Sequence, residues 1–598
     1  MTRARIAAAL ALVTVSFAAC AARTGPSPAR RASISPVVLP ASPRDALAVI
    51  ARRALSEFDR AAAMAIVRTA DRGFRTRGNE AYVATLAAVQ EHLTHAGFRA
   101  VGPADAAGAG PAESMRPEIL ESDAPIWDAR AGLIEVVAPV IERLQRFDTH
   151  DDTQRTMLVA YTSPGDVTAE LVEWTPGTRV PRQVLQGRIV LTNARPSQAG
   201  AALARAGAVA VVSSHTEAFN HVERFPDTIR YEMFDGEAPP SVPMFNASPR
   251  TAARLRALLH AGPVRLHVQS DCVLRRGRTE TLVARIEGAH RDASPIVVVA
   301  HADEPGANDN GSGVGTLAEA AALYARWITT GSIPRPEHPI VFLFGMEIEM
   351  SRRWLQFHSA PRPVFAVSVD MAGEPASMSS MLVERTPDPG AVRVRPPDHH
   401  TAWGTGSVRR AWVHGTFLNA LAIGAVHSVG WTREVGDHPF EGGSDHVPFL
   451  ERFVPALLLW HFPDDAYHTN RDRFARVDAD EMAGVAAALL AMLRVGAGGR
   501  DDDVLAMIAL NESYARDRMA VEAVQSTAAI PPTSAPPDMR AGARVREHEH
   551  LNAWLQWFDE ALQSCATLAD APSPTVLRAI AEARDRVRVL GVSIHSAL

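Results

Sequence analysis

The sequence contains no lysine, since all 61 basic residues among its 598 are arginine. Schiff-base catalysis needs a lysine amine, and a P-loop needs its lysine beside the phosphates, so both are excluded. The formal net charge is only −6, and no basic stripe is present. The electrostatic footprint of a nucleic-acid-binding protein is therefore missing as well.

Cysteine is scarce and long apolar runs are absent. Besides Cys20, only Cys272 and Cys565 occur. These two could form a disulfide only if the fold brings them together, and two separate buried thiols are an equally good interpretation. Beyond the N-terminus, no stretch reaches about 18 consecutive apolar residues, so we expect no transmembrane helix.

The N-terminus has the pattern of an export signal. Two arginines precede an apolar stretch over residues 6–15, and small residues then lead to Cys20. The sequence Phe-Ala-Ala-Cys that ends at Cys20 resembles a bacterial lipobox, which directs a lipid anchor onto the cysteine. Ordinary signal cleavage near Ala19 or Ala22 is the alternative. We therefore expect a periplasmic or cell-envelope lipoprotein that touches the membrane only through Cys20.

Side chains that can bind a metal follow three apolar runs. These runs cover residues 297–300, 340–344 and 365–369, and they predict buried strands of a mostly parallel sheet. The ligand crevice of such a sheet lies outside the carboxyl ends of its strands. The candidate residues at these ends and in two loops are His301, Asp303, Asp309, Glu347, Glu349, Asp370 and His468.

A cation would explain why so many acidic and imidazole groups gather in one crevice. Without it, the groups would repel and desolvate one another. Because the potential ligands are nitrogen and oxygen atoms without thiolate, zinc is favoured over manganese or cobalt. Each residue alone has an ordinary structural explanation, but their joint position at strand ends predicts a metal site.

The chain also carries an ordered set of short motifs. They are His301-Ala302-Asp303, the stretch Gly-Ala-Asn-Asp-Asn-Gly-Ser-Gly over residues 306–313, Asp370-Met371 and Tyr467-His468-Thr469. These motifs resemble the di-zinc aminopeptidase family, whose relatives include glutamate carboxypeptidases, the transferrin-receptor ectodomain and glutaminyl cyclases. The resemblance covers about residues 45–110 and 275–495. It implies an α/β fold of the zinc-exopeptidase, phosphorylase/hydrolase-like type, with helices flanking a mostly parallel mixed sheet.

The resemblance also implies residue roles. His301 and Asp370 would complete one zinc site, and His468 with a glutamate would complete the other. Asp309 would bridge both ions, because a carboxylate offers two oxygens. Asp303 would accept the second ring N–H of His301 and so fix its tautomer.

The glutamates depart from the family pattern. Relatives usually carry two adjacent glutamates, one a general base and one a ligand, whereas here Ile348 separates Glu347 from Glu349. If the strand continues, both side chains share a face and could divide the two roles. If it bends, only Glu347 reaches the site. We assign Glu347 as the base and Glu349 as the ligand, and expect Glu347 to be indispensable.

The triplet Ser444-Asp445-His446 invites a hydrolase-triad interpretation. Contiguous residues cannot face one another as a triad does, because triads are assembled across space. We therefore expect Asp445 and His446 to lie in a loop behind the metal ligands or to face the substrate.

The remaining segments differ from the predicted core in composition and in the pattern of predicted elements. Short strands and helices of small residues between about 121 and 270 resemble the protease-associated (PA) domain, a β-rich insert of secreted peptidases; a generic α/β lobe is the alternative. The predicted divisions are a signal peptide over 1–20, a tether over 21–41, the N-terminal part of the peptidase domain over 42–120, the PA-like insert over 121–272, the zinc peptidase core over 273–497 and a C-terminal helical region over 498–598.

Taken together, the sequence predicts an exported zinc-dependent exopeptidase that uses two zinc ions. An aminopeptidase acting on peptides is the first choice, and a carboxypeptidase or a glutaminyl-cyclase-like enzyme is the alternative on the same scaffold. A binding protein with a decayed site is the rival from another class. Retention of His301, Asp309, Asp370 and His468 argues against decay.

Overall fold

The computed structural model describes residues 43–101, 112–148, 150–178, 182–234, 236–404, 406–431, 434–569 and 571–598. The predicted signal peptide, the tether and the lipidation site Cys20 lie outside the described residues. Within the described part, no single helix is long and apolar enough to cross a membrane. The helices α12 (Ala479–Gly496) and α13 (Asp501–Ala529), bent by 118° at their junction, pass the same test as a pair.

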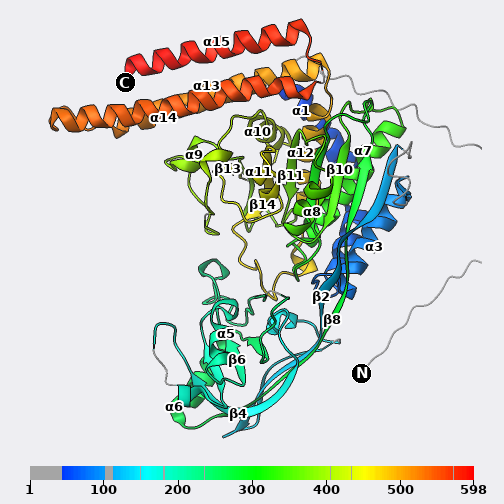
Figure 1. Cartoon of the computed structure of the whole chain (residues 1–598), viewed down its shortest axis with the longest axis vertical. Helices are drawn as coiled ribbons and strands as arrows, with labels where there is room; N and C mark the ends of the chain where they lie inside the picture. Colours follow the sequence, from blue (N-terminus) through cyan, green and yellow to red (C-terminus); the bar gives the residue numbers. More distant parts are fainter. Residues whose placement is uncertain are drawn as a thin grey trace, which may run out of the picture.

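A mixed sheet forms the centre of the molecule (Figure 1). Four middle strands run parallel to one another: β10 (Ile340–Gly345), β9 (Ile296–His301), β11 (Phe365–Val369) and β14 (Ala456–Phe462). On one side β12 (Ser380–Glu384) pairs antiparallel with β14 and parallel with β13 (Val435–His438). On the other side β8 (Arg265–Ile286) pairs antiparallel with β10. The predicted fold class, a large α/β sheet flanked by helices, is confirmed.

Helices cover both faces of this sheet, and every residue of its middle strands is therefore buried. One face packs against α1 (Pro43–Glu57), α2 (Arg60–Ala70), α3 (Glu80–His95), α7 (Gly311–Thr329), α10 (Leu418–Ser428) and α12 (Ala479–Gly496). The other face packs against α8 (Glu349–Phe357) and α11 (Val447–Glu451). Two-sided burial explains why these strands appear in the sequence as continuous apolar runs.

Two long strands connect the central sheet to a second lobe, which corresponds to the predicted insert. β2 (Glu113–Ala138) and β8 pair antiparallel along most of their length and lead away from the core (Figure 1). The lobe contains β3 (Glu142–Phe147), β4 (Gly165–Glu173), β5 (Ile189–Thr192), β6 (Ala210–Ser213) and β7 (Met244–Asn246), with α5 (Pro196–Arg205) and α6 (Pro249–Ala261). It has its own apolar core. The predicted boundaries of the insert, residues 121 and 272, lie inside β2 and β8 respectively. The identity of the insert as a PA domain stays a prediction.

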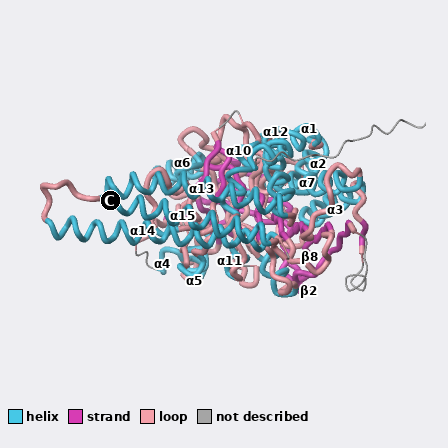
Figure 2. Tube along the Cα trace, turned by 90° about the horizontal axis from the view of Figure 1, so that it is seen from above, coloured by secondary structure: helices cyan, strands magenta, loops and turns pink. Residues whose placement is uncertain are grey.

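Long helices form the C-terminal region. α13 (Asp501–Ala529), α14 (Pro537–Ser564) and α15 (Pro574–Ala597) pack against one another and project beyond the core, as Figure 2 shows. Cys565 is buried beneath them, whereas Cys272 is buried in the insert. Both cysteines are free thiols, so they do not pair.

Candidate metal centre

The predicted ligands come together at the carboxyl ends of the parallel strands. His301 is the last residue of β9, and Asp370 follows the last residue of β11. Asp309 lies in the loop before α7, which Asn310 caps by accepting a hydrogen bond from Gly313 N. A Cβ atom at Gly313 would lie 2.5 Å from the Val369 carbonyl oxygen. Glycine at 313 therefore lets the Asp309 loop pack closely against the end of β11.

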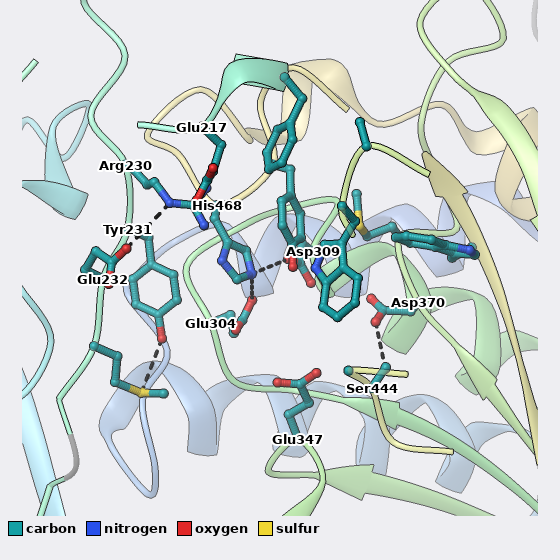
Figure 3. A pocket seen from close by; sticks show the side chains of 18 of the residues that line it. Glu217, Arg230, Tyr231, Glu232, Glu304, Asp309, Glu347, Asp370, Ser444 and His468 are labelled. Carbon is teal, nitrogen blue, oxygen red and sulfur yellow. Dashed lines mark hydrogen bonds and ion pairs between the residues drawn. The ribbon is translucent and has the colours of Figure 1, made fainter. Parts of the chain in front are cut away.

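Among the described residues, Asp309 belongs to two adjoining ligand groups. One is His301, Asp309 and Asp370, and the other is Glu304, Asp309 and His468; in each group the ligand atoms lie within 4.8 Å of one another. Asp309 Oδ1 is 3.2 Å from His301 Nε2, and Asp309 Oδ2 is 3.1 Å from His468 Nε2. Figure 3 shows the second of these contacts. One carboxylate thus presents one oxygen to each histidine, which is the arrangement that a bridging ligand requires.

The electrostatics of the buried groups fit a cation. Burial, together with the carboxylates of Asp309 and Asp445, raises the pKa of Asp370 to about 7 despite the nearby His301. Burial would lower the pKa of His301, but Asp370 and the other carboxylates raise it well above its ordinary value. Asp370 Oδ1 is buried and has no hydrogen-bond partner in the described part of the chain. Nitrogen and oxygen donors with uncompensated negative charge suit zinc.

The structure adds Glu304, which the sequence analysis did not select. Its carboxylate lies 3.0 Å from His468 Nε2, and the residue is buried. Its φ of 72° is uncommon for a residue other than glycine. This local turn directly after Asp303 brings a carboxylate to the second ligand group. The available sequence signal was the position of Glu304, immediately after the His301-Ala302-Asp303 motif.

Glu349 is not in the site, so its assignment as a metal ligand is wrong. β10 ends at Gly345, and Ile348 has a φ of 61°, which turns the chain away from the strand direction. Glu349 then begins α8, where its side chain is 48% exposed and lies 3.3 Å from Arg352. The chain thus bends after β10, which is the second of the two possibilities considered from the sequence. Of the two glutamates, only Glu347 lines the cavity into which the ligand groups open.

The expected contact of Asp303 with His301 is also wrong. Asp303 Oδ1 instead accepts a hydrogen bond of 2.9 Å from Glu347 N. The His301 ring nitrogen Nδ1 lies 3.4 Å from Asp445 Oδ2. Residues two apart in an extended segment project side by side rather than toward one another, so the partner of the His301 ring comes from a different loop. Asp303 therefore positions the glutamate and not the histidine.

The loop with Ser444, Asp445 and His446 lies behind the ligands. Ser444 Oγ donates a hydrogen bond of 2.9 Å to Asp370 Oδ2, and Ile348 N donates one of 2.6 Å to Asp445 Oδ1. His446 Nε2 lies 2.9 Å from Glu384 Oε1, buried outside the pocket. Asp445 thus connects the His301 side of the site to the turn that presents Glu347, whereas His446 fastens the loop to β12.

A third acidic and imidazole group lies beside this loop, consisting of Glu384, His438 and Glu441. His438 Nε2 accepts a hydrogen bond of 2.9 Å from Trp460 Nε1, and Nδ1 lies 2.9 Å from the Pro439 carbonyl oxygen. Both ring nitrogens are engaged, so His438 has no lone pair left for a metal. The group holds the loop in place.

The ligand groups open into a cavity of about 590 Å³, within the range of small-molecule sites. Its walls come from the core and from the insert. Tyr231 N donates a hydrogen bond of 2.6 Å to the His468 carbonyl oxygen, which ties the insert to a candidate ligand. Trp403 and Trp460 line the cavity. Phe440 does not line the cavity and packs against the ring of His446, with ring centroids 5.7 Å apart.

Comparisons with known proteins agree with this architecture. Residues 281–379 match the model of peptidase family M28. Peptidase M28 precursor from Shewanella amazonensis SB2B has a TM-score of 0.52 at 16% identity, covering 76% of this chain and 96% of that one, and it shows the fold. No curated protein matches the chain.

Two aminopeptidases also match. The aminopeptidase from Aneurinibacillus sp. strain AM-1 has a TM-score of 0.47 at 17% identity and covers 74% of this chain and 95% of that one. The zinc aminopeptidase from Bacillus subtilis has a TM-score of 0.49 at 14% identity, with coverages of 73% and 95%. The family match over residues 281–379 confirms the recognition made from the motifs and supports a hydrolase that acts as a peptidase.

Proposed function

We propose that the protein is a zinc-dependent exopeptidase that holds two zinc ions and removes N-terminal residues from peptides. The observation that carries this proposal is the position of Asp309 between His301 and His468, with one carboxylate oxygen facing each ring. His301, Asp309 and Asp370 would hold one ion, and Glu304, Asp309 and His468 the other.

Zinc would supply the polarisation of the scissile carbonyl and the acidification of a water molecule. The protein supplies the proton transfer. Glu347 lines the cavity, and burial raises its pKa well above the ordinary range of a carboxyl, in spite of His301 nearby. A carboxylate of raised basicity is suited to take the proton of the attacking water and deliver it to the leaving amine. Asp303 fixes the Glu347 backbone for this task.

N-terminal specificity is supported by the charge of the cavity wall. Glu304 and Glu347 line the cavity beside the ligand groups. A free α-ammonium group is complementary to such a wall, whereas an internal peptide segment offers no positive charge of its own. The N-terminus of a peptide would therefore be favoured over an internal segment.

The proposal places the protein outside the cytoplasmic membrane, held there by a lipid on Cys20. The support is the sequence pattern alone: a charged start, a short apolar stretch and small residues before Cys20. Peptides in the cell envelope would be its substrates.

The direct test is metal content together with activity. Purified protein is expected to bind two equivalents of zinc and to hydrolyse aminoacyl-arylamides. Chelation should abolish hydrolysis and lower the Tm, because a ligand that binds only the native state stabilises it. Zinc or cobalt should restore both. One equivalent of metal would favour a cyclase-like site, and absence of metal and of hydrolysis would contradict the proposal in favour of a binding protein.

A further inference from the structure

Arg230 is the most unusual group in the cavity wall. Its side chain is only 6% exposed, and Nε and Nη1 have no hydrogen-bond partner among the described residues. Buried polar groups are almost always hydrogen-bonded, and an unsatisfied charged donor is costly. The nearest carboxylate oxygen recorded is Glu232 Oε1, at 3.6 Å from Nε, which is an ion-pair distance and not a hydrogen bond.

The acidic neighbours of Arg230 also interact with other residues. Glu217 forms an ion pair with Arg195 and lies 3.3 Å from His215 Nε2. Glu232 Oε2 accepts a hydrogen bond of 3.1 Å from Ser197 Oγ. Glu232 Oε1 has no hydrogen-bond partner among the described residues and lies at ion-pair distance from both Arg195 and Arg230, at 3.8 and 3.6 Å. Arg195 and Arg230 balance the charges of Glu217 and Glu232, so an incoming anion meets no excess of negative charge. Arg230 therefore has unused hydrogen-bond donors at Nε and Nη1, although its charge is balanced.

Arg230 shares the cavity with the metal centre. It pairs with Thr469 through a backbone bridge, and the next residue, Tyr231, hydrogen-bonds the His468 backbone. Figure 3 shows Arg230, Glu217 and Glu232 beside His468 on the wall that the insert contributes. Since an extended residue spans about 3.5 Å, a short peptide bound at the ligand groups can reach this wall.

We propose that Arg230 binds a carboxylate of the peptide substrate while the scissile bond lies at the metal centre. A guanidinium donates parallel N–H groups to both oxygens of a carboxylate, from Nη2 together with either Nε or Nη1. Because Nε and Nη1 of Arg230 both lack a partner among the described residues, either of these two pairs is open to a carboxylate. The inference rests on the proposed peptidase function and narrows its substrates to short peptides with an acidic group. That group is either the C-terminal α-carboxylate or an acidic side chain.

Matched peptides distinguish the two sources on the zinc-loaded full chain. Ala-Leu is compared with Ala-Leu-amide, and Ala-Glu-amide with Ala-Gln-amide. We expect KM to be lower for the acidic member of one pair by roughly tenfold to a hundredfold, the usual effect of hydrogen bonds to a charged group. A preference in the first pair assigns the α-carboxylate, and a preference in the second assigns the side chain.

Substitution of Arg230 then tests whether this residue causes the preference for the acidic peptide. R230Q is expected to remove it by raising KM for the acidic peptide, with kcat and the neutral peptide little changed. R230K, which keeps the charge but loses the fork, should retain only part of the preference. R250Q is the matched control, because Arg250 is an exposed insert residue paired with Asp227 at 2.7 Å. Its preference should equal that of the unmodified protein.

The outcomes separate the two proposals. If no peptide is cleaved, the peptidase proposal fails, and the four peptides are compared by the shift in Tm that each produces in the zinc-loaded protein. Equal KM values, or equal Tm shifts, within both pairs would overturn the carboxylate site without any variant. A preference that survives in folded R230Q would overturn it too.

Discussion

Replacing Glu304 with glutamine tests the least expected feature of the metal centre. The carboxylate of Glu304 lies 3.0 Å from His468 Nε2, in the ligand group that also contains Asp309. Glutamine keeps the size of the side chain but removes its negative charge and one ligand oxygen. E304Q is therefore expected to weaken the ion beside His468 and to leave the ion beside His301 in place.

The magnitude follows from ligand and linkage energetics. Loss of a residue that only orients a metal ligand costs about 10–100-fold in affinity, so loss of a direct ligand costs at least that much. At a zinc concentration about 100 times Kd, a bound ion stabilises the native state by about 2.7 kcal/mol. A hundredfold weaker Kd reduces this to about 0.4 kcal/mol, by the same relation. The expected loss, about 2.3 kcal/mol, is large enough to shift the Tm.

Metal stoichiometry after dialysis, and Tm with and without zinc, measure this effect. E349Q is the control, since Glu349 is exposed and forms only a surface pair with Arg352, worth about 1 kcal/mol or less. E304Q should retain one equivalent of zinc and E349Q two. The reverse result, with E349Q losing an ion and E304Q keeping both, would refute the geometry that places Glu304 and not Glu349 at the site.

Three further predictions concern the base, acid stability and the membrane. E347Q should lower kcat by roughly 10²–10⁴-fold with both ions retained; loss of an ion would make Glu347 a ligand instead. Burial would raise the pKa of Glu522, but His550, Arg518 and Arg395 lower it to about 2 from 4.5. Its stabilisation, about 3 kcal/mol at 1.36 kcal/mol per unit, is present above pH 4.5 and is lost as the pH falls toward 2. The free energy of unfolding of E522Q should therefore fall below that of the unmodified protein at pH 7 and converge with it near pH 2, in denaturant titrations. C20S should release soluble protein or leave uncleaved precursor, and unchanged fractionation and mature mass would contradict lipidation.

Much of the core could be predicted because its signals are local. The three apolar runs are the strands β9, β10 and β11, and the residues at their ends face one crevice. Strand burial and the order of the motifs were enough to bring His301, Asp309, Asp370 and His468 together in advance.

The errors arose where one backbone angle decides the direction of a side chain. Ile348 is β-branched, and its positive φ has no signature in the sequence, so the turn that exposes Glu349 was not predictable. Glu304 was missed for the same reason, because an extended continuation after Asp303 would direct it elsewhere. Arg230 was missed because its position depends on the packing of the insert against the His468 loop, which no local pattern encodes.

The insert takes part in the site itself. The His468 carbonyl oxygen accepts the Tyr231 N–H, and the Tyr231 ring meets the His468 ring edge-on, with centroids 5.4 Å apart. A candidate metal ligand of the core is therefore held by backbone and ring contacts from the insert. The same insert segment carries Arg230 and Glu232. Because the contacts that fix His468 and the groups that face the substrate share one short segment, displacing the insert would disturb ligand geometry and substrate recognition together.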